Sequence, residues 1–229
     1  MRCIKALLAF FTAVPLKAPE LDFTCAWALP YVAAPVVGGA GAAAYAATHD
    51  PLVSYLVLLL ATGLNHLDGL ADSADALMVR DREKARAVLD DPRRGTAGVF
   101  AVAVVVALAA TASPHSPPDY LAADLYSKAL TVAAAGNSRP FKPGLGALFV
   151  ETLRRRWPLA APGLALAAVY NPAAAAAAAA ASLLLFLALY RHLGGVNGDV
   201  FGALLEVSRA AYLYALGRTP LAQGLTVPW

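Results

Sequence analysis

Long stretches without a charged side chain constrain this sequence more than any other feature. Residues 23–49 and 157–190 contain no Asp, Glu, Lys or Arg. A helix needs about 20 consecutive apolar residues to cross a bilayer, so the first stretch is long enough for one crossing and the second is too long for one. Charged residues make up 14% of the chain and its mean hydropathy is +0.60. Because ordinary soluble domains are more polar, we expect a multi-span membrane protein.

The breaks between the apolar stretches predict the fold class. We expect an all-α fold, a polytopic transmembrane helix bundle of six or seven helices in a single integral membrane domain, residues 1–229. Asn171-Pro172 divides the longest stretch, because proline cannot continue a helix. The run after Pro51 is short, so its helix is expected to continue into the acidic residues that follow. The predicted spans are 23–49, 52 into the acidic segment, 95–118, 119–136, the two halves of 157–190, and 200–217.

The first 25 residues carry two further features. Residues 2–18 place basic side chains around an apolar run, and the prolines and lysine at 15–19 interrupt any small-residue cleavage site. We therefore expect a retained amphipathic helix on the membrane surface and not a cleaved signal peptide. Cys3 and Cys25 have no metal-ligand spacing, and they are expected to be free, reduced and structural.

Lys and Arg are distributed unequally among the predicted connections. The connections without either residue are 48–51, 113–118 and 171–172, and those with most of the basic residues are 80–94, 139–156 and 191–199. By the positive-inside rule the second set is cytoplasmic. This predicts a multi-pass protein of the cell membrane whose acidic segment, 90–98 segment, Gly144 loop and Asp199 share the cytoplasmic face. The net charge of +3 comes without a basic run interleaved with aromatics, so no nucleic-acid partner is expected.

Three aspartates directly after an uncharged run form the strongest candidate site. Asp68, Asp72 and Asp75 are spaced four and three residues apart, which on a helix places their carboxylates within a wedge of roughly 60°. Like charges beside apolar surroundings are neutralised by protonation or by a cation. Because carboxylate oxygens are the ligands of hard divalent metals, we expect a metal site; a solvated acidic helix face is the alternative.

The segment 91–98 contains an acid, two arginines and glycines at the start of a predicted helix. Backbone N–H groups and guanidinium groups at such a helix start can hold phosphate, which makes Arg93 and Gly95 candidate ligands. An ordinary helix cap with flanking positive charges is the alternative.

Ionisable residues also fall inside predicted helices. Lys128 lies near the middle of a span and is expected to face the bundle interior and meet an anion. Glu206 and Arg209 are one turn apart in the last helix and are expected to pair with each other, with a catalytic role as the alternative. His66 is expected to pack or to support a ligand-binding residue.

A glycine-rich segment at 194–199 precedes the last helix and ends in a carboxylate. Gly194, Gly195, Asn197 and Asp199 suit two roles, wrapping around a ligand or capping the last helix.

In this order and spacing the motifs resemble a known family. They are HLDGLADSAD at 66–75, DPRRGTAG at 91–98, GLG at 144–146, and GGVNGD at 194–199 followed by Gly202 and Glu206. The chain resembles cobalamin synthase, the adenosylcobinamide-GDP ribazoletransferase family, nearly end to end. The resemblance implies an integral membrane enzyme that transfers the cobinamide phosphate of adenosylcobinamide-GDP to the 5′-hydroxyl of α-ribazole, or to α-ribazole 5′-phosphate. GMP leaves and Mg²⁺ is required.

The resemblance also implies roles for the candidate residues. Mg²⁺ is expected on Asp68, Asp72, Asp75 and Asp91; phosphate or nucleotide contacts on Arg93, Gly95, Lys128, Gly194, Gly195, Asn197 and Asp199; and catalytic roles for Asp75, Asp72 and Lys128. One aspartate accepts the proton of the attacking hydroxyl, with Asp75 as the first choice. Lys128 stands where the family usually has Arg, and Ala76 where it commonly has Gly, but no carboxylate is lost.

Two other classes of membrane protein also use intramembrane carboxylates. A CDP-alcohol-type phosphatidyltransferase usually has Asp-Gly-x-x-Ala-Arg, whereas this chain has Asp-Gly-Leu-Ala-Asp at 68–72. An ion-coupled transporter would place carboxylates near the bilayer midplane, often in repeated halves, and no internal repeat is visible. The expected partners are adenosylcobinamide-GDP, α-ribazole and the lipid bilayer. The sequence leaves open whether the chain forms a homo-oligomer.

Overall fold

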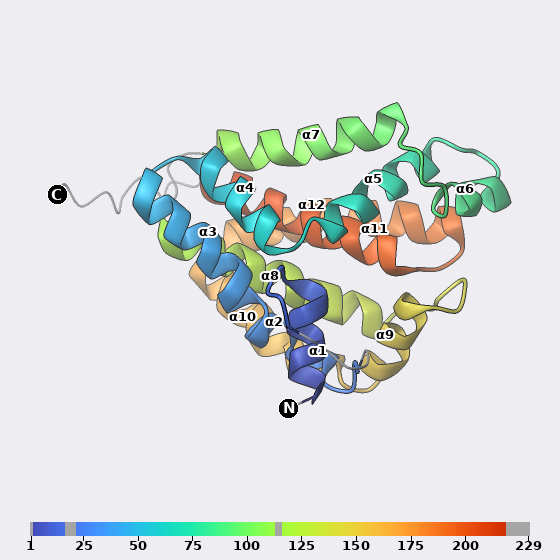
Figure 1. Ribbon diagram of the computed structural model, residues 1–229, viewed down its shortest axis with the longest axis horizontal. Coiled ribbons are helices and arrows are strands. Elements are labelled where there is room, and N and C mark those ends of the chain that lie inside the picture. Colours follow the sequence, from blue (N-terminus) through green and yellow to red (C-terminus); the bar gives the residue numbers. More distant parts are fainter. Residues whose placement is uncertain (1, 17–21, 113–115, 219–229) are drawn as a thin grey trace.

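The computed structural model describes residues 2–16, 22–112 and 116–218, and within these ranges the chain is helical apart from its connections. The single β-type pairing there is the isolated bridge between Pro140 and Val196. The predicted turn residues 113–115 and the end of the predicted 2–18 helix lie outside the described residues. The helices, drawn in Figure 1, are α1 (Arg2–Phe11), η1 (Ala26–Ala28), α2 (Leu29–Val32), α3 (Ala34–Thr48), α4 (Pro51–Ala61), α5 (Asn65–Leu77), α6 (Arg82–Val88), α7 (Thr96–Thr111), α8 (Pro117–Gly136), α9 (Leu145–Leu153), η2 (Trp157–Ala160), α10 (Ala161–Tyr170), α11 (Pro172–Leu193) and α12 (Gly198–Leu216).

Several helices are apolar and long, as a membrane protein requires. In the described parts of the chain, Ala26–Thr48 and Pro172–Leu193 are each long and apolar enough to cross a membrane, and α4 with α5 would add a third, bent span. α7 and Trp157–Tyr170 are apolar but shorter. The all-α architecture and the division at Asn171-Pro172 are confirmed, and the apolar helices fit a membrane protein. The count of six or seven crossings stays a prediction, as does the membrane-surface position of α1.

The expectation of one helix running from residue 52 into the acidic segment is wrong. α4 ends at Ala61, α5 begins at Asn65, and the two helix axes meet at 96°. Between them Gly63 and Leu64 have φ angles of +76° and +64°, in the left-handed region that a right-handed helix cannot contain. Hydrophobic length alone does not reveal this break. Its consequence is that the three aspartates lie on a separate helix with its own direction.

α12 is the central helix and packs against α5, α7, α8 and α11 (Figure 1). Two glycines let α5 and α12 approach closely. A Cβ on Gly69 of α5 would lie 2.9 Å from both Cα and O of Asp199, and a Cβ on Gly202 of α12 would lie 3.0 Å from the carbonyl oxygen of His66. Such small residues permit backbone contact between helices. The glycines at 69 and 202 therefore set the distance between the acidic helix and the central helix.

A fully buried ionic cluster joins α8 to α12. The Arg209 guanidinium donates to Asp124 Oδ1 at 2.8 Å and to Glu206 Oε2 at 2.7 Å, and Lys128 pairs with the other oxygen of Asp124. All four side chains are 0% exposed, so each charge is compensated where an unpaired one would be costly. The predicted pairing of Glu206 with Arg209 and the interior position of Lys128 are confirmed. A contact of Lys128 with substrate phosphate stays a prediction, and it would require the ammonium group to leave Asp124.

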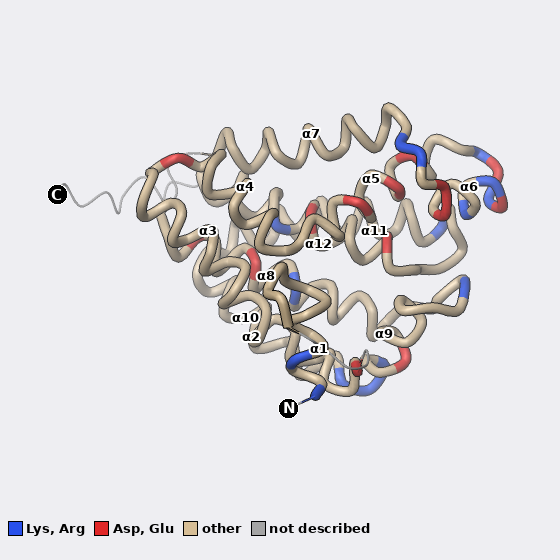
Figure 2. The backbone as a smooth tube through the Cα atoms, in the orientation of Figure 1, with Lys and Arg blue, Asp and Glu red and all other residues tan. Residues whose placement is uncertain are grey.

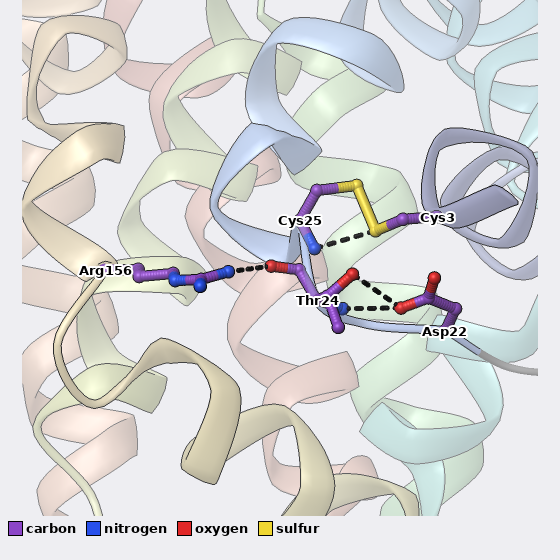
Figure 3. The surroundings of a disulfide bond; sticks show 5 residues. All are labelled: Cys3, Asp22, Thr24, Cys25 and Arg156. Carbon is purple, nitrogen blue, oxygen red and sulfur yellow. Dashed lines mark hydrogen bonds between the residues drawn. A yellow bond between two sulfur atoms is a disulfide. The ribbon is translucent and has the colours of Figure 1, made fainter. Parts of the chain in front are cut away.

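The expectation that the two cysteines are free is wrong, because Cys3 and Cys25 form a disulfide with their Cα atoms 5.9 Å apart (Figure 3). α1 buries Leu7 and Phe11 against the bundle, and this packing brings Cys3 to the start of the first long helix. Sequence spacing tests metal-ligand patterns but does not show which side chains meet in space. The neighbouring Thr24 carbonyl accepts a hydrogen bond from Arg156 (Figure 3).

Charged residues gather toward one end and one edge of the bundle. Figure 2 shows most Lys, Arg, Asp and Glu around α6, the α8–α9 connection and the ends of α1 and α9. The opposite end, where α3 meets α4 and α10 meets α11, has few. Of the connections that were predicted to share a face, 80–94, 191–199 and the start of 139–156 lie together, whereas Arg156 lies against Thr24 near the amino-terminal end.

Candidate active site

Arg94 links two of the three predicted site aspartates. Its guanidinium pairs with Asp72 Oδ1 at 2.7 Å and also with Asp68. Asp72 is 5% exposed, whereas the Asp68 side chain remains 59% exposed. The arginine comes from the segment before α7, more than 20 residues further along the chain. Arg94 belongs to the segment whose guanidinium groups were expected to hold phosphate, and its pairing with Asp68 and Asp72 was not predicted, because local helix spacing does not reveal a partner from another element.

Asp75, the third aspartate, caps the start of α7. Its carboxylate accepts hydrogen bonds from the backbone N–H groups of Gly95, at 2.6 Å, and Gly98, at 2.9 Å. A Cβ on Gly98 would lie 2.7 Å from Asp75 Oδ2, so glycine provides the room for the carboxylate. Carboxylates are favourable at a helix N-terminus. The helix start that was predicted to hold phosphate through Gly95 therefore holds an internal anion. The three aspartates lie on one face of α5, as predicted, and this face is turned toward residues 94–98.

Asp91 and Arg93 pair with each other beside this cluster. Arg93 Nη2 donates to Asp91 Oδ2 at 2.7 Å, and the Arg93 backbone N–H donates to Oδ1 at 2.9 Å. These hydrogen bonds lower the pKa of Asp91 to about 2. The Asp91 carbonyl also accepts from Arg94 at 3.2 Å. The structure thus connects Asp91 to the α5 aspartates through Arg94, while its carboxylate contacts Arg93; its role as a metal ligand stays a prediction.

The glycine-rich segment 194–199 performs the capping role that was one of its two predicted roles. Gly194, with φ +72°, ends α11, and Asn197 caps α12 by accepting from the Val200 N–H at 3.2 Å. Asn197 Nδ2 also donates to Asp199 Oδ2 at 2.5 Å. Gly195, with φ +151°, lies against the Arg139 carbonyl. Contacts of these residues with a ligand stay a prediction.

Two arginines of α6, which sequence analysis did not assign, hold the same loop in place. Arg82 Nε donates to the His192 carbonyl and Arg86 Nε to the Leu193 carbonyl, each at 2.9 Å. These are the last carbonyls of α11, which lack partners within their helix. Lys142 Nζ pairs with Asp90 Oδ1 at 2.6 Å. The predicted co-location of the acidic motif, the 90–98 segment, the loop around Gly144 and Asp199 is therefore confirmed.

The donor chemistry of this cluster suits a hard cation. In the described conformation, no three acidic, His or Cys side chains of residues 2–16, 22–112 and 116–218 converge as a metal-binding group, because Arg94 contacts Asp68 and Asp72 while α7 contacts Asp75. The Arg94 guanidinium nevertheless occupies a cation's position between two carboxylates. Carboxylate oxygens are also the ligands that Mg²⁺ takes in phosphate-binding sites. The residues thus fit Mg²⁺ in type, and the predicted metal set stays a prediction.

The fold and this cluster define a class of protein: an all-helical bundle of membrane type with a carboxylate and arginine site at its charged end. The chain belongs to the cobalamin-5-phosphate synthase family, which it matches over residues 3–217. The resemblance found in the motifs is therefore confirmed.

Three relatives illustrate the match, each named adenosylcobinamide-GDP ribazoletransferase. The protein of Pyrobaculum islandicum is 58% identical over 98% of this chain and 100% of its own length. That of Pyrobaculum calidifontis is 61% identical, with 93% and 98% covered. That of Thermoplasma acidophilum is 30% identical, with 93% and 90% covered. No solved structure matches this chain.

Proposed function

We propose that this chain is a transferase that joins the cobinamide phosphate of adenosylcobinamide-GDP to α-ribazole, or to α-ribazole 5′-phosphate, and releases GMP. The observation that carries the proposal is the family match over almost the whole chain, together with the acidic and arginine cluster that the family motifs form. The same match disfavours a phosphatidyltransferase or an ion-coupled transporter.

The two possible acceptors, α-ribazole and α-ribazole 5′-phosphate, indicate which hydroxyl attacks. α-Ribazole 5′-phosphate has no free 5′-hydroxyl, so a single site that accepts both compounds uses a hydroxyl of the ribose ring. We therefore replace the expected 5′-hydroxyl by a ring hydroxyl. Its oxygen forms a bond to the phosphorus next to cobinamide, the bond from that phosphorus to the bridging oxygen breaks, and GMP leaves with the bridging oxygen. The hydroxyl proton passes to a carboxylate, for which Asp75 remains our first choice.

The cluster supplies positioning and charge neutralisation, which are the main demands of phosphoryl transfer. Asp68, Asp72 and Asp75, with Asp91, are the proposed holders of Mg²⁺. When bound, the metal neutralises charge that develops on the diphosphate oxygens. Arg94 bridges Asp68 and Asp72, which helix spacing places on one face of α5, and Arg93 beside it offers a second guanidinium to phosphate. We place this end of the bundle at the cytoplasmic side of the cell membrane, because its connections carry most of the basic residues.

The direct test uses membranes that contain the protein, adenosylcobinamide-GDP and α-ribazole, with GMP release measured at several Mg²⁺ concentrations. Magnesium-dependent release that requires α-ribazole supports the proposal. A phosphatidyltransferase would instead release CMP from a CDP-activated lipid, and a transporter would release neither nucleotide.

Asp72→Asn tests the role of this carboxylate in the reaction separately from its role in folding. It keeps the side-chain shape but removes the buried charge beside Arg94, and we expect at least about 100-fold slower GMP release with normal insertion and purification. Asp90→Asn is the matched control, because Asp90 is an exposed acid paired with Lys142, and it should retain most activity. Full activity of Asp72→Asn would exclude the proposed metal site.

A further inference from the structure

A cavity of about 220 Å³ lies between α1, α5, α9 and α12, beside the acidic cluster. Its walls are aromatic: Phe11, Phe23, Phe149 and Phe201 each contribute a ring and are each no more than 5% exposed. The ring centroids of Phe11 and Phe149 are 6.0 Å apart, and those of Phe149 and Phe201 are 5.7 Å apart. Faces and edges of this kind bind planar apolar groups by stacking.

His66 is the buried polar group of this wall. It is 6% exposed and stacks on Phe11 with a centroid distance of 5.5 Å and an interplanar angle of 23°. Neither ring nitrogen has a hydrogen-bond partner among the described residues. Buried polar atoms normally have partners, and in every protonation state an imidazole carries at least one N–H donor. Thr131, also in the wall, already donates to the Ser127 carbonyl at 2.9 Å. His66, which lines the cavity, therefore has an N–H donor without a partner among the described residues.

One side of the cavity is polar and lies beside the acidic cluster. Asn65, Gly198 and Asp199 line it, and Asn65 lies one helical turn before Asp68 on α5. The Asp199 backbone touches α5 at Gly69. A bound molecule with an apolar planar end and a polar end would therefore place its polar end next to the proposed reaction site.

We propose that this cavity binds the dimethylbenzimidazole base of α-ribazole, with His66 donating a hydrogen bond to the ring nitrogen that carries no sugar. The ribose then lies at the polar side of the cavity, with its ring hydroxyls toward the α5 aspartates. The proposal rests on the proposed function and names the position of one substrate. The cavity is smaller than the about 300–1,000 Å³ typical of pockets for drug-sized ligands, as suits a bicyclic base whose sugar stays outside.

The chemistry of the wall selects this base over guanine, the other base of the reaction. Dimethylbenzimidazole has a single hydrogen-bonding atom and is otherwise apolar, which one N–H donor and a ring of phenylalanines satisfy. Guanine presents several donors and acceptors on its edges, and most would be left without partners against these walls, which is unfavourable.

The test is a binding cycle on the intact protein in detergent, measured by titration calorimetry without the second substrate. The first ligand is α-ribazole, and the second is its indole analogue, in which the free ring nitrogen is replaced by C–H. We expect the unmodified protein to bind α-ribazole about tenfold more tightly than the analogue. His66→Phe keeps the ring and its stacking but lacks the donor, and should bind the two ligands equally. Tyr212→Phe loses one buried hydroxyl, which bonds the Ala167 carbonyl and lies outside the cavity, and should keep the preference.

Equal binding of the two ligands by the unmodified protein would overturn the proposal. This comparison uses no variant, so it does not depend on whether a variant folds. So would a His66→Phe protein that keeps the preference, or one whose affinity falls for GMP and not for α-ribazole. If α-ribazole is transferred without any such preference, the proposed function stands and the cavity assignment fails. If α-ribazole does not bind and no GMP is released, the proposed function itself fails.

Discussion

Replacing Gly69 by Ala tests whether the contact between α5 and α12 positions the site. Inside a helix this change normally stabilises by about 0.5–1 kcal/mol. At Gly69 the new Cβ would lie 2.9 Å from Cα and O of Asp199, where ordinary contact begins at 3.4 Å, an overlap of 3.4 − 2.9 = 0.5 Å against backbone atoms. Backbone cannot rotate away as a side chain can, so we expect overpacking to cost about 1–3 kcal/mol.

Gly39→Ala is the matched control, because Gly39 lies inside α3 and a Cβ there would meet nothing within 4 Å. Thermal unfolding of both variants in detergent should place Gly69→Ala below Gly39→Ala by roughly 1–3 kcal/mol. The displaced Asp199 and α5 should also lower ribazole transfer by about tenfold or more, whereas Gly39→Ala keeps it. Equal stability and equal activity of the two variants would refute the argument that this glycine sets the distance between the helices.

Substitutions at three further positions probe other contacts. Gly95 and Gly98 donate to different oxygens of Asp75, so Asp75→Asn keeps an acceptor for one of these N–H groups and should destabilise less than Asp75→Ala, while transfer falls. Asp75→Ala loses both hydrogen bonds and should destabilise by about 1–2 kcal/mol, and equal melting of the two variants would argue against the cap. Asp124→Ala leaves two buried cations short of a partner and should destabilise by about 3–5 kcal/mol; a smaller change, measured by denaturant unfolding, would show that water reaches the cluster. Cys3→Ser should lower the stability of unreduced protein by about 3 kcal/mol and abolish its response to thiol reductant, and a remaining response would contradict the cross-link.

The sequence predicted those parts of the fold that depend on composition and on single elements. Charge-free stretches and prolines located the helices, and the distribution of Lys and Arg predicted that 80–94, 191–199 and the start of 139–156 lie together. The bend before Asn65 was missed because Gly63 occurs in an apolar run where glycine is also common in helix contacts. The disulfide was missed because it depends on how α1 packs.

The sequence predicted which residues form the site better than it predicted which residues contact one another. The spacing of Asp68, Asp72 and Asp75 correctly placed them on one face, but it could not show that Arg94 and the start of α7 neutralise them. The sequence also did not show why residue 98 is a glycine. Gly98 was interpreted as part of a phosphate-binding turn, whereas its lack of a Cβ makes room for the Asp75 carboxylate. Contacts between elements far apart in sequence need the three-dimensional arrangement.

The covalent bond at Cys3 changes how the amino-terminal end of this protein can move. Terminal helices usually fray first and most often, but α1 is held at its beginning to Cys25, while Phe11 near its end forms part of the aromatic wall. If α1 detaches from the bundle, it can therefore only rotate about the disulfide, and its first residues stay close to Cys25. A preparation kept in strong thiol reductant would lose this restraint. Ligand affinities measured with and without reductant would therefore belong to proteins whose amino-terminal helix differs in mobility.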